Sequence, residues 1–487
     1  MSEKHPHLSV TGSPVILLFS YDLRLQDHAG VAEALASGRP IVPVFIYDES
    51  KGTRPLGAAS KWWLHRSLKV LDEELQKCAS RLIIGSGKTE KILPKICIKL
   101  SAKTVIYSHK FDPESEAADE RIEVDLKGHG IEFLRYNNTL LAPPNLVKTG
   151  EGKPFRIFTP FYKALQASGF CDIAHMSSHH IQPWPAPEAW PLSLAIDDLG
   201  LDATRTPSGI DWAAGFDRFT PGERGARAAL RHFLAHNLEN YGEGRDRPDK
   251  DLTSHLSPHL RFGEISPRRI LFELDKAVRE DTALAASAAK FRSELAWREF
   301  SYGLLDQQPH LHKTNFRDDF DHFPWRDDDG DFRAWCRGET GYDLVDAGMR
   351  ELWRTGYMHN RVRMVCASFL IKHLLVDWRR GEEWFWDCLV DADPANNPAS
   401  WQWVAGCGAD AAPYFRIFNP MTQAEKFDPA GLYRTRYIAG YQSRIHSKSS
   451  RDLFDDTGKP ADYPQPIVDH AFARNRALEA YKHRGTE

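Results

Sequence analysis

The sequence contains few cysteines and no long apolar run. Only seven cysteines occur among the 487 residues, and no two are spaced as C-x-x-C, which argues against a disulfide framework and favours reduced thiols. No apolar stretch approaches the roughly 20 residues that a membrane-spanning helix needs. Residues 1–13 are polar and lack the apolar centre of an export signal. We therefore expect a cytoplasmic protein.

An excess of charge of one sign is also missing. The 63 Lys and Arg residues nearly balance the 67 Asp and Glu residues, and the formal net charge is −4. No basic surplus therefore marks a nucleic-acid-binding protein. A balanced total still permits a basic face, because phosphate contacts depend on local charge.

Two frequent site motifs are incomplete. Gly87-Lys88-Thr89 matches the end of a phosphate-binding P-loop, but Leu82 stands where that motif requires its first glycine. The acidic run at residues 327–331 lacks the terminal glutamate of a calcium loop, so we interpret it as a solvated acidic loop. We predict no metal site.

The first 145 residues alternate between short apolar runs and longer amphipathic stretches. Residues 59–77 carry apolar side chains at helical spacing, and runs of buried-strand type cover residues 15–19, 41–46, 81–84 and 104–107. Strands that alternate with helices predict an α/β domain at residues 1–145, with a parallel, Rossmann-like sheet. Ligands of such sheets bind beyond the carboxyl ends of the strands, which makes the loops after Phe19 and Ile46 candidate pocket loops.

The remaining chain is predicted to be a linker followed by helices. Residues 146–215 contain a proline cluster at 183–191 and are interpreted as an interdomain linker. Residues 216–487 are predicted to form an all-α domain, and Ser266 is the expected N-cap of one of its helices. The helical patterns cover residues 225–237, 267–280, 286–306, 343–355, 360–378 and 381–390.

Large aromatic residues concentrate in the predicted helical domain. Nine of the fourteen tryptophans lie between residues 297 and 403. At the start of this region, Glu294, Trp297 and Arg298 are spaced at i, i+3 and i+4, so they share one helix face. A carboxylate, an indole and a guanidinium on one face suit a planar polar ligand. A half-buried helix with an internal ion pair is the alternative.

Further polar segments support a cofactor site. Asn360, Arg363 and Met364 share a second helix face, although a basic solvated turn is the alternative, and Arg361 is expected off that face. Residues 391–403 contain Asp, Asn and Pro, and we predict an irregular polar loop there. The hydroxyls and amides of residues 253–257 precede a helical stretch and can bind phosphate. Together these segments indicate a phosphate-bearing aromatic cofactor.

Several segments, in this order and spacing, resemble the photolyase/cryptochrome family over nearly the whole chain. The matching segments are 22–28 (DLRLQDH), 158–161 (FTPF), 253–257 (TSHLS), 297–300 (WREF), 358–361 (MHNR) and 410–420 (DAAPYFRIFNP). The resemblance is to DNA photolyases, and within them to a bacterial class III-like group. It implies light-driven repair of cyclobutane pyrimidine dimers in DNA, by electron transfer from excited, reduced FAD to a dimer that is flipped out of the duplex.

The resemblance places a non-covalently bound FAD in the helical domain. Asn397 is expected to face the flavin N5 atom. Phe291 stands where a tryptophan is common in one branch of the family, and Pro398 follows Asn397 where small residues are usual. Residues that match the family's FAD contacts are Tyr241, Thr253, Ser254, His255, Leu256, Ser257, Phe291, Arg298, Arg363, Asp391, Ala392, Asp393 and Asn397.

The resemblance also implies a DNA site and an electron path. Glu294 is expected to hydrogen-bond the flipped bases. The path that reduces FAD in light would use Trp401, Trp378 and Trp325, with Trp384 or Trp386 as a second branch; ordinary core packing is the alternative for these tryptophans. Residues that match the family's dimer and DNA contacts are Glu294, Trp297, Arg298, Asn360, Arg361, Met364, Trp403 and Gln423.

The family leaves two further questions open. Cryptochromes share FAD and the tryptophan chain but act as blue-light receptors; the dimer-pocket residues and the short segment after residues 463–468 favour repair. Residues 57–65 resemble a group whose antenna is methenyltetrahydrofolate, while a deazaflavin or no antenna stays possible. Either Glu114 or Glu116 matches the antenna carboxylate. We expect a monomer that binds damaged DNA, associates with the nucleoid when bound, and does not contact a membrane.

Overall fold

The computed structural model describes residues 12–50, 54–174, 176, 182–203, 211–410, 415–439, 441 and 463–484. Residues 411–414, which belong to the family segment at 410–420, lie outside the described residues. Contacts divide the chain into two compact units. The first comprises residues 1–204, 219–236 and 254–309, and the second comprises residues 205–218, 237–253 and 310–487. The boundaries expected near residues 145 and 215 stay a prediction about functional domains.

The first unit contains a five-stranded parallel sheet. Its strands are β1 (Val15–Phe19), β2 (Ile41–Tyr47), β3 (Ile83–Ser86), β4 (Thr104–Ser108) and β5 (Glu132–Tyr136), in the spatial order β3-β2-β1-β4-β5. Every pairing is parallel, with Val15 opposite Ile41 on one side and Thr104 on the other. This confirms the α/β prediction.

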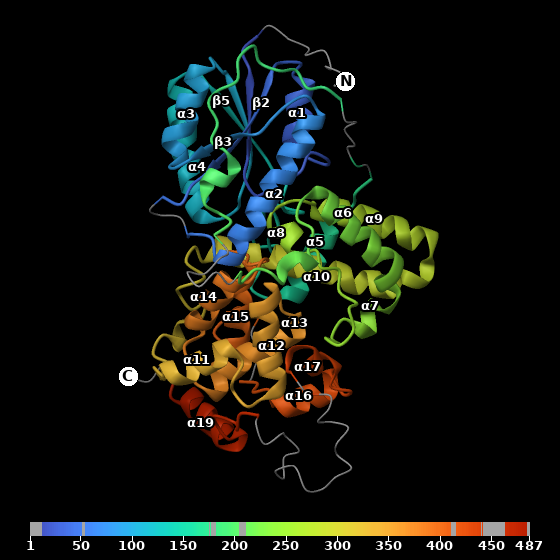
Figure 1. The fold of residues 1–487 in the computed structure, drawn as a ribbon, viewed down its shortest axis with the longest axis vertical. Coiled ribbons are helices and arrows are strands. Elements are labelled where there is room, and N and C mark those ends of the chain that lie inside the picture. The colour runs from blue at the N-terminus through green and yellow to red at the C-terminus, as the bar shows by residue number, and fades with distance from the viewer. Residues whose placement is uncertain are drawn as a thin grey trace. The chain divides into compact units, whose positions relative to one another are not determined.

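Helices cover both faces of this sheet. The connections from β1 to β3 contain α1 (Ala29–Ala36) and α2 (Ala58–Lys77), and those from β3 to β5 contain α3 (Thr89–Lys99) and α4 (Pro113–Gly128). Because the strand order reverses after β3, right-handed crossovers place the two helix pairs on opposite faces. Figure 1 shows this arrangement, and it explains why β1 and β4 are buried along their whole length.

The first unit also contains helices from the later part of the chain. These are α5 (Phe158–Ala167), α6 (Glu223–His232), α8 (Ser257–Arg261), α9 (Pro267–Glu280) and α10 (Ala285–Gln307). The predicted cap of α9 is present, because the Ser266 hydroxyl accepts a hydrogen bond from the Arg269 amide at 2.9 Å.

The described part of the second unit is helical, and it contains no strand. Its helices are α7 (Leu238–Gly244), α11 (Asp329–Arg337), α12 (Asp343–Thr355), α13 (Asn360–Ser368), α14 (Trp378–Cys388), α15 (Asn396–Ala405), α16 (Pro420–Phe427), α17 (Leu432–Tyr437) and α19 (His470–Lys482). This confirms the predicted helical C-terminal region. In neither unit is any described helix both long and apolar enough to cross a membrane.

Among the elements that differ from the prediction are one helix and one strand. The helix expected at residues 360–378 divides into α13, a π-helical turn at Phe369–His373 and a break before α14, where Leu375 has a φ of 55°. Spacing cannot detect this break, because the apolar residues continue through it. Strand β5 was not predicted, since charged residues interrupt its sequence and it lies at an edge of the sheet.

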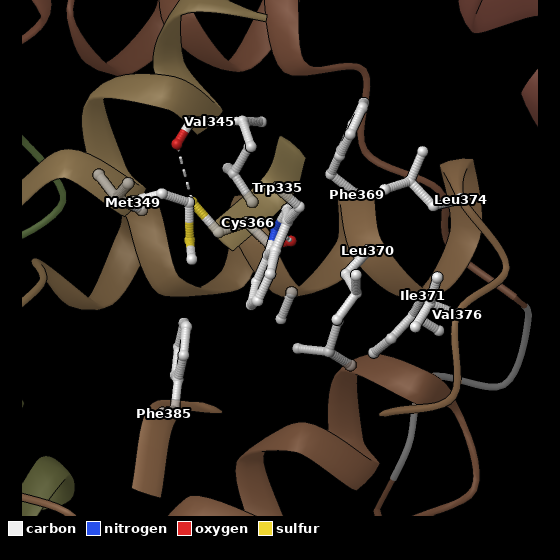
Figure 2. Packing of buried hydrophobic residues seen from close by; sticks show 14 of the residues in the cluster. Trp335, Val345, Met349, Cys366, Phe369, Leu370, Ile371, Leu374, Val376 and Phe385 are labelled. Atoms are coloured by element: carbon white, nitrogen blue, oxygen red, sulfur yellow. Dashed lines mark hydrogen bonds between the residues drawn. The ribbon is translucent and has the colours of Figure 1, made fainter. Parts of the chain in front are cut away.

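The core of the second unit is built around Trp335 and the segment between α13 and α14. Trp335 has no exposed surface, and its indole N–H donates to the carbonyl of Cys366 at 3.0 Å. Figure 2 shows Trp335 close to Cys366 and Leu370, and both of these residues are fully buried. A cluster of buried aromatic and aliphatic side chains therefore supports the helices that carry most of the predicted site residues.

A buried polar network holds the loop after β1 in one conformation. The Asp22 carboxylate accepts hydrogen bonds from the Ser20 amide at 2.7 Å and from the Ser108 hydroxyl, and it lies 2.7 Å from His28 Nε2. Burial acts to raise the pKa of Asp22, but its hydrogen bonds and the charge of His28 lower that pKa below its ordinary value. The carboxylate is therefore ionised and fixes the candidate pocket loop from three directions.

We predict that Asp22→Ala strongly destabilises the protein. Its partners would be left buried without an acceptor, and breaking a buried charged network typically costs about 3–5 kcal/mol of unfolding free energy. Denaturant unfolding of the variant measures this loss. Asp125→Ala, at an exposed position of α4, is the control and should change the unfolding free energy by less than about 0.5 kcal/mol. Equal stability of the two variants would contradict the role of Asp22.

Candidate functional site

Helix α10 carries the carboxylate, indole and guanidinium that the sequence placed on one helix face. Glu294 is half-buried and lies 3.3 Å from Lys290 Nζ, one turn earlier. Trp297 is half-buried, and its ring stacks on Phe158 of α5 with centroids 3.7 Å apart and planes 5° apart. Since Phe158 covers one face of the indole, only the opposite face can take a planar ligand.

Arg298 is held in place by the chain itself. Its guanidinium donates to the Thr139 carbonyl at 2.9 Å and to the Glu299 carboxylate at 3.3 Å, and it lies over the Tyr302 ring. An arginine with these contacts is fixed in orientation before any ligand arrives, which lowers the entropic cost of binding an anion.

Glu299 orients Arg298 and was not singled out from the sequence. Its carboxylate accepts hydrogen bonds from the amides of Leu141 at 2.8 Å and Ala142 at 3.3 Å. Burial raises the pKa of Glu299 to about 7, even though Arg298 and the two amides oppose the shift. Its position directly after Arg298 in a matched family segment was the only sequence signal.

The predicted phosphate segment is divided between the two units. In the first unit, His255 adopts a left-handed conformation with a φ of 52°, directly before α8. Such strained backbone conformations concentrate at functional sites. In the second unit, the Thr253 carbonyl accepts a hydrogen bond from Asn237 Nδ2 at 3.4 Å, and Tyr241 of α7 is buried.

The remaining predicted cofactor residue of the first unit is Phe291. It is buried on α10, and its ring lies against Phe233 with centroids 4.5 Å apart. Here packing within the unit is established, and contact with a cofactor stays a prediction.

Helix α13 carries a partly buried ion pair one turn after the expected amide. Asn360 is exposed at the first position of the helix, and Arg363 lies one turn later. Arg363 donates to the Asp391 carboxylate at 2.8 Å and to the Met358 carbonyl at 2.6 Å. Burial acts to lower the pKa of Arg363, but Asp391 raises it above its ordinary value, so this arginine stays charged.

Arg361 does not point away from this group as expected. Its guanidinium pairs with Asp246 at 2.7 Å and also approaches the Met364 sulfur at 3.7 Å. The same guanidinium lies 4.5 Å from the centre of the Phe427 ring. The contacts with Asp246 and Phe427 thus hold the Arg361 guanidinium beside Met364. Gln423 is half-buried on the neighbouring chain segment that forms α16.

The irregular loop predicted at residues 391–403 is a helix from Asn396 onward, so this prediction is wrong. The Asp393 carboxylate accepts hydrogen bonds from the Ala395 amide at 2.9 Å and the Asn396 amide at 2.8 Å. It therefore compensates the first unpaired amides of α15. Pro398 lies in the first turn, where a missing N–H costs nothing. Asp and Pro disfavour the interior of a helix, but at α15 they form its start.

Asn397 is buried with its amide orientation fixed. Its Nδ2 donates both to the Glu382 carboxylate at 2.9 Å and to the Glu382 carbonyl at 3.0 Å. Because both partners only accept, Nδ2 must face Glu382, and Oδ1 is the acceptor side of the amide. Within the second unit, an oriented amide oxygen and the charged Arg363 are polar groups of the kind that a flavin nucleotide can hydrogen-bond.

The three tryptophans of the predicted electron path belong to the second unit. Trp401 of α15 is buried against α14, where a side chain at Gly381 would approach the Trp401 ring to 2.3 Å. Trp378 begins α14 and has no exposed surface, whereas Trp325 is half-buried. The amide of the following residue, Arg326, donates to the Leu375 carbonyl at 2.7 Å, which places this segment beside the residues preceding α14.

Other tryptophans also pack near this path. Trp384 stacks on Trp353 with centroids 6.0 Å apart, and Trp353 is about half exposed. Trp386 is buried in the core of the unit, and Trp403 is half-buried against it. Trp335 contacts Trp401 edge to face at 6.2 Å. Proximity alone therefore does not distinguish the electron path from ordinary core packing.

Comparisons with known proteins agree over both regions. Residues 15–188 match the family described as DNA photolyase, and residues 291–483 match the FAD binding domain of DNA photolyase. The chain is 45% identical to the deoxyribodipyrimidine photo-lyase of Agrobacterium fabrum, over 97% of this chain and 98% of that relative. It is 34% identical to the deoxyribodipyrimidine photo-lyase of Halobacterium salinarum, over 96% and 98% respectively.

A solved structure is similar throughout. The bacterial class III photolyase from Agrobacterium tumefaciens is 43% identical, with a TM-score of 0.90, and the match covers 98% of this chain and 99% of that one. A cryptochrome from Synechocystis is 29% identical, with a TM-score of 0.81 and coverage of 97% and 100%.

We predict that Glu299 makes stability fall as the pH rises. The unfolded glutamate loses its proton near its ordinary pKa of 4.5, whereas the folded one keeps it to about 7. Between these values the native state binds more protons, so its unfolding free energy decreases with increasing pH. Denaturant unfolding of wild type and Glu299→Gln at about pH 5 and about pH 8 measures the effect. The variant should gain stability relative to wild type at the higher pH; parallel pH profiles would exclude the assigned titration.

Proposed function

The chain belongs to the photolyase/cryptochrome family, and from this premise we propose that it repairs cyclobutane pyrimidine dimers in DNA in a light-driven reaction. The observation that carries the proposal is the 45% identity to a deoxyribodipyrimidine photo-lyase over 97% of the chain. The FAD-binding family region at residues 291–483 supports FAD as the cofactor. When bound in its reduced form, FAD would supply the light-excited electron donor for opening the dimer, and the electron would return to it afterwards.

The proposed FAD contacts rest on charge and hydrogen-bond complementarity. Arg363 stays charged beside Asp391, and Arg298 is held by Thr139 and Glu299, so both cations are oriented without a ligand. Asn397 directs its acceptor oxygen to the ligand, which suits the N–H that reduced flavin carries at N5. A neutral amide there accepts this hydrogen without competing for the proton.

The proposed dimer contacts combine stacking with hydrogen bonding. Trp297 presents one indole face to a flipped base, because Phe158 covers the other. Glu294 accepts hydrogen bonds from base N–H groups, and Asn360 offers an exposed amide. Met364 and Trp403 supply half-buried apolar surface. We assign Arg361 and Gln423 to the DNA backbone, where contacts position the duplex without reading its sequence.

The proposed electron path carries charge through the second unit. Trp401, Trp378 and Trp325 run from a buried ring beside α14 to a half-buried one. Each indole can lose and regain one electron, so the three rings connect the protein surface to the flavin. Trp384, stacked on the exposed Trp353, supports a second exit.

An antenna pigment is proposed beyond the carboxyl ends of the strands in the first unit. Glu116 is preferred over Glu114 as the antenna carboxylate, because it pairs with His109 at 2.9 Å. The hydrogen bond from His109 holds the pKa of Glu116 below its ordinary value and keeps it anionic. Methenyltetrahydrofolate is the proposed pigment and a deazaflavin the alternative; an archaeal photolyase of similar fold, from Sulfolobus tokodaii, contains two FAD molecules.

Signalling without repair is the competing function. The chain is 33% identical to cryptochrome-2 of Arabidopsis thaliana over 87% of its length, but over only 70% of that relative. Blue light and reductant should restore dimer-containing DNA in the presence of the purified, yellow protein. If the protein binds FAD and becomes reduced in light but leaves the dimers intact, it is a light receptor.

We predict that Trp297→Ala weakens binding of dimer-containing DNA and abolishes most repair, while FAD stays bound. Stacking on one base contributes about 1–3 kcal/mol, so affinity should fall roughly 5- to 150-fold. Titration of dimer-containing and undamaged duplexes measures the loss, which should be confined to the damaged DNA. Trp353→Ala, also a tryptophan with exposed surface, is the control and should retain wild-type binding. Unchanged affinity of Trp297→Ala would refute the dimer pocket.

We also predict that Trp378→Phe blocks light-driven reduction of oxidised FAD, because phenylalanine is too hard to oxidise to relay the electron. Absorbance of the flavin during illumination with a reductant measures the rate. Trp335→Phe is the matched control: Trp335 is equally buried and contacts Trp401, but it lies off the proposed path. If the Trp335 variant loses photoreduction and the Trp378 variant retains it, the electron passes through Trp335.

A further inference from the structure

The middle tryptophan of the proposed path has one defined hydrogen-bond acceptor. The indole N–H of Trp378 donates to Asn315 Oδ1 at 2.9 Å. Trp378 has no exposed surface, and Asn315 is only 6% exposed. Solvent therefore does not compete for this hydrogen bond. What happens to the indole proton when Trp378 is oxidised depends on Asn315.

We propose that Asn315 is a positioning residue of the electron path, which keeps Trp378 protonated while it carries a positive charge, so that the charge moves on to Trp325. This inference rests on the proposed function, because it concerns the same light-driven reduction of FAD. It adds a residue that neither the family segments nor the sequence patterns had indicated.

The orientation of the Asn315 amide is set by a carboxylate. Its Nδ2 donates to Asp321 Oδ1 at 2.6 Å. Because a carboxylate only accepts, the amide nitrogen must face Asp321 and the amide oxygen must face Trp378. The charge of Asp321 also polarises the amide and strengthens its oxygen as an acceptor.

The loop that carries Asn315 is tied to the helices of the two buried tryptophans. Gln402, next to Trp401 on α15, donates to the carbonyls of Leu311 at 2.7 Å and Thr314 at 2.8 Å, and accepts from the Phe316 amide at 2.7 Å. Gln402 is fully buried. The position of Asn315 relative to both indoles is therefore fixed by satisfied, buried hydrogen bonds.

Charged groups around Trp378 affect how easily it carries a positive charge. The Arg379 guanidinium lies 4.8 Å from the centre of the Trp378 ring and disfavours a second positive charge there. Asp377 offsets part of that charge, with its oxygens 3.0 and 3.1 Å from Arg379 Nη1. The negative end of the Asn315 dipole meets the indole at its N–H, where oxidation makes the ring most acidic.

With FAD bound in its oxidised form, Trp401 would give one electron to the excited flavin, and Trp378 would then give one electron to Trp401. Trp378 is left as a radical cation, whose N–H is far more acidic than that of neutral indole. An amide oxygen is too weak a base to take this proton, so the radical stays cationic and accepts an electron from Trp325. The half-buried Trp325 then loses its own proton to water.

A base at position 315 would instead remove the indole proton of oxidised Trp378. A carboxylate in contact with the indole would take the proton from oxidised Trp378 and leave a neutral radical, which is a weaker oxidant for Trp325. An amide is thus the acceptor that binds the N–H without capturing the proton. This requirement distinguishes Asn315 from an ordinary structural hydrogen-bond partner.

The test exchanges the amide of Asn315 and the carboxylate of Asp321 without changing the total charge. Asn315→Asp is combined with Asp321→Asn, so that an amide still faces a carboxylate but the carboxylate now contacts Trp378. Asp321→Asn alone is the control, because it keeps an amide against the indole. All three proteins carry Trp325→Phe, so the charge stops at Trp378. The ratio of flavin to protein absorbance establishes that each variant folds and binds FAD.

Transient absorption after a light pulse, in water and in heavy water, gives the readout. With Asn315 present, we expect the spectrum of the cationic tryptophan radical until the charge returns to the flavin, at the same rate in both solvents. The exchanged pair should form the neutral radical instead, several-fold more slowly in heavy water. The Asp321→Asn control should give the same spectrum as the protein that keeps both native residues, Asn315 and Asp321.

The outcomes separate the two levels of the hypothesis. A neutral radical at Trp378 in the presence of Asn315, or identical spectra for the exchanged pair and the control, would overturn the role of Asn315 and leave the electron path intact. If no tryptophan radical forms at all in the Trp325→Phe background, the proposed path through Trp378 is wrong, and the role of Asn315 falls with it.

Discussion

Within each compact unit, buried acidic side chains accept hydrogen bonds from distant parts of the chain and fix the fold of that unit. In the first unit Asp22 joins β1 to β4 through Ser108, and Glu264 accepts from the Trp63 indole at 2.9 Å. In the second, Glu351 accepts from the Tyr433 hydroxyl at 2.6 Å. A buried polar group without hydrogen-bond partners is costly, so each of these residues forces several segments into one arrangement.

The same constraint orients the proposed catalytic groups. Glu299 holds Arg298, and Glu382 fixes the amide of Asn397. Asp321 does the same for Asn315 beside Trp378. At Asn397 and Asn315 the acceptor oxygens of a neighbouring acidic side chain decide which way the amide points. The chemistry proposed for the chain depends on these orientations, because a flipped amide at position 397 or 315 would present a donor where an acceptor is needed.

Much of the fold could be predicted from local pattern. Parallel strands of a doubly covered sheet are apolar throughout, and so β1, β2 and β4 stood out in the sequence. Helices α9 and α12 begin and end at the predicted residues, because their apolar spacing is regular and, for α9, the Ser266 cap marks the start. The pattern was misleading at α15, where Asp393, Asn397 and Pro398 suggest a loop but form a capped first turn. Whether such residues break or begin a helix depends on hydrogen bonds that spacing does not specify.

The sequence by itself determined the fold class, the family and the chemical types available for the site, because these follow from periodicity and from residues matched one by one. Only the tertiary structure decided which of those groups are oriented and by what. Trp297 has one covered face because Phe158, far earlier in the chain, stacks on it. Trp378 meets an amide instead of a base because Asn315, in a loop held by Gln402, is brought to it. These contacts join residues separated by tens to more than a hundred positions, and their geometry depends on packing that no local pattern encodes.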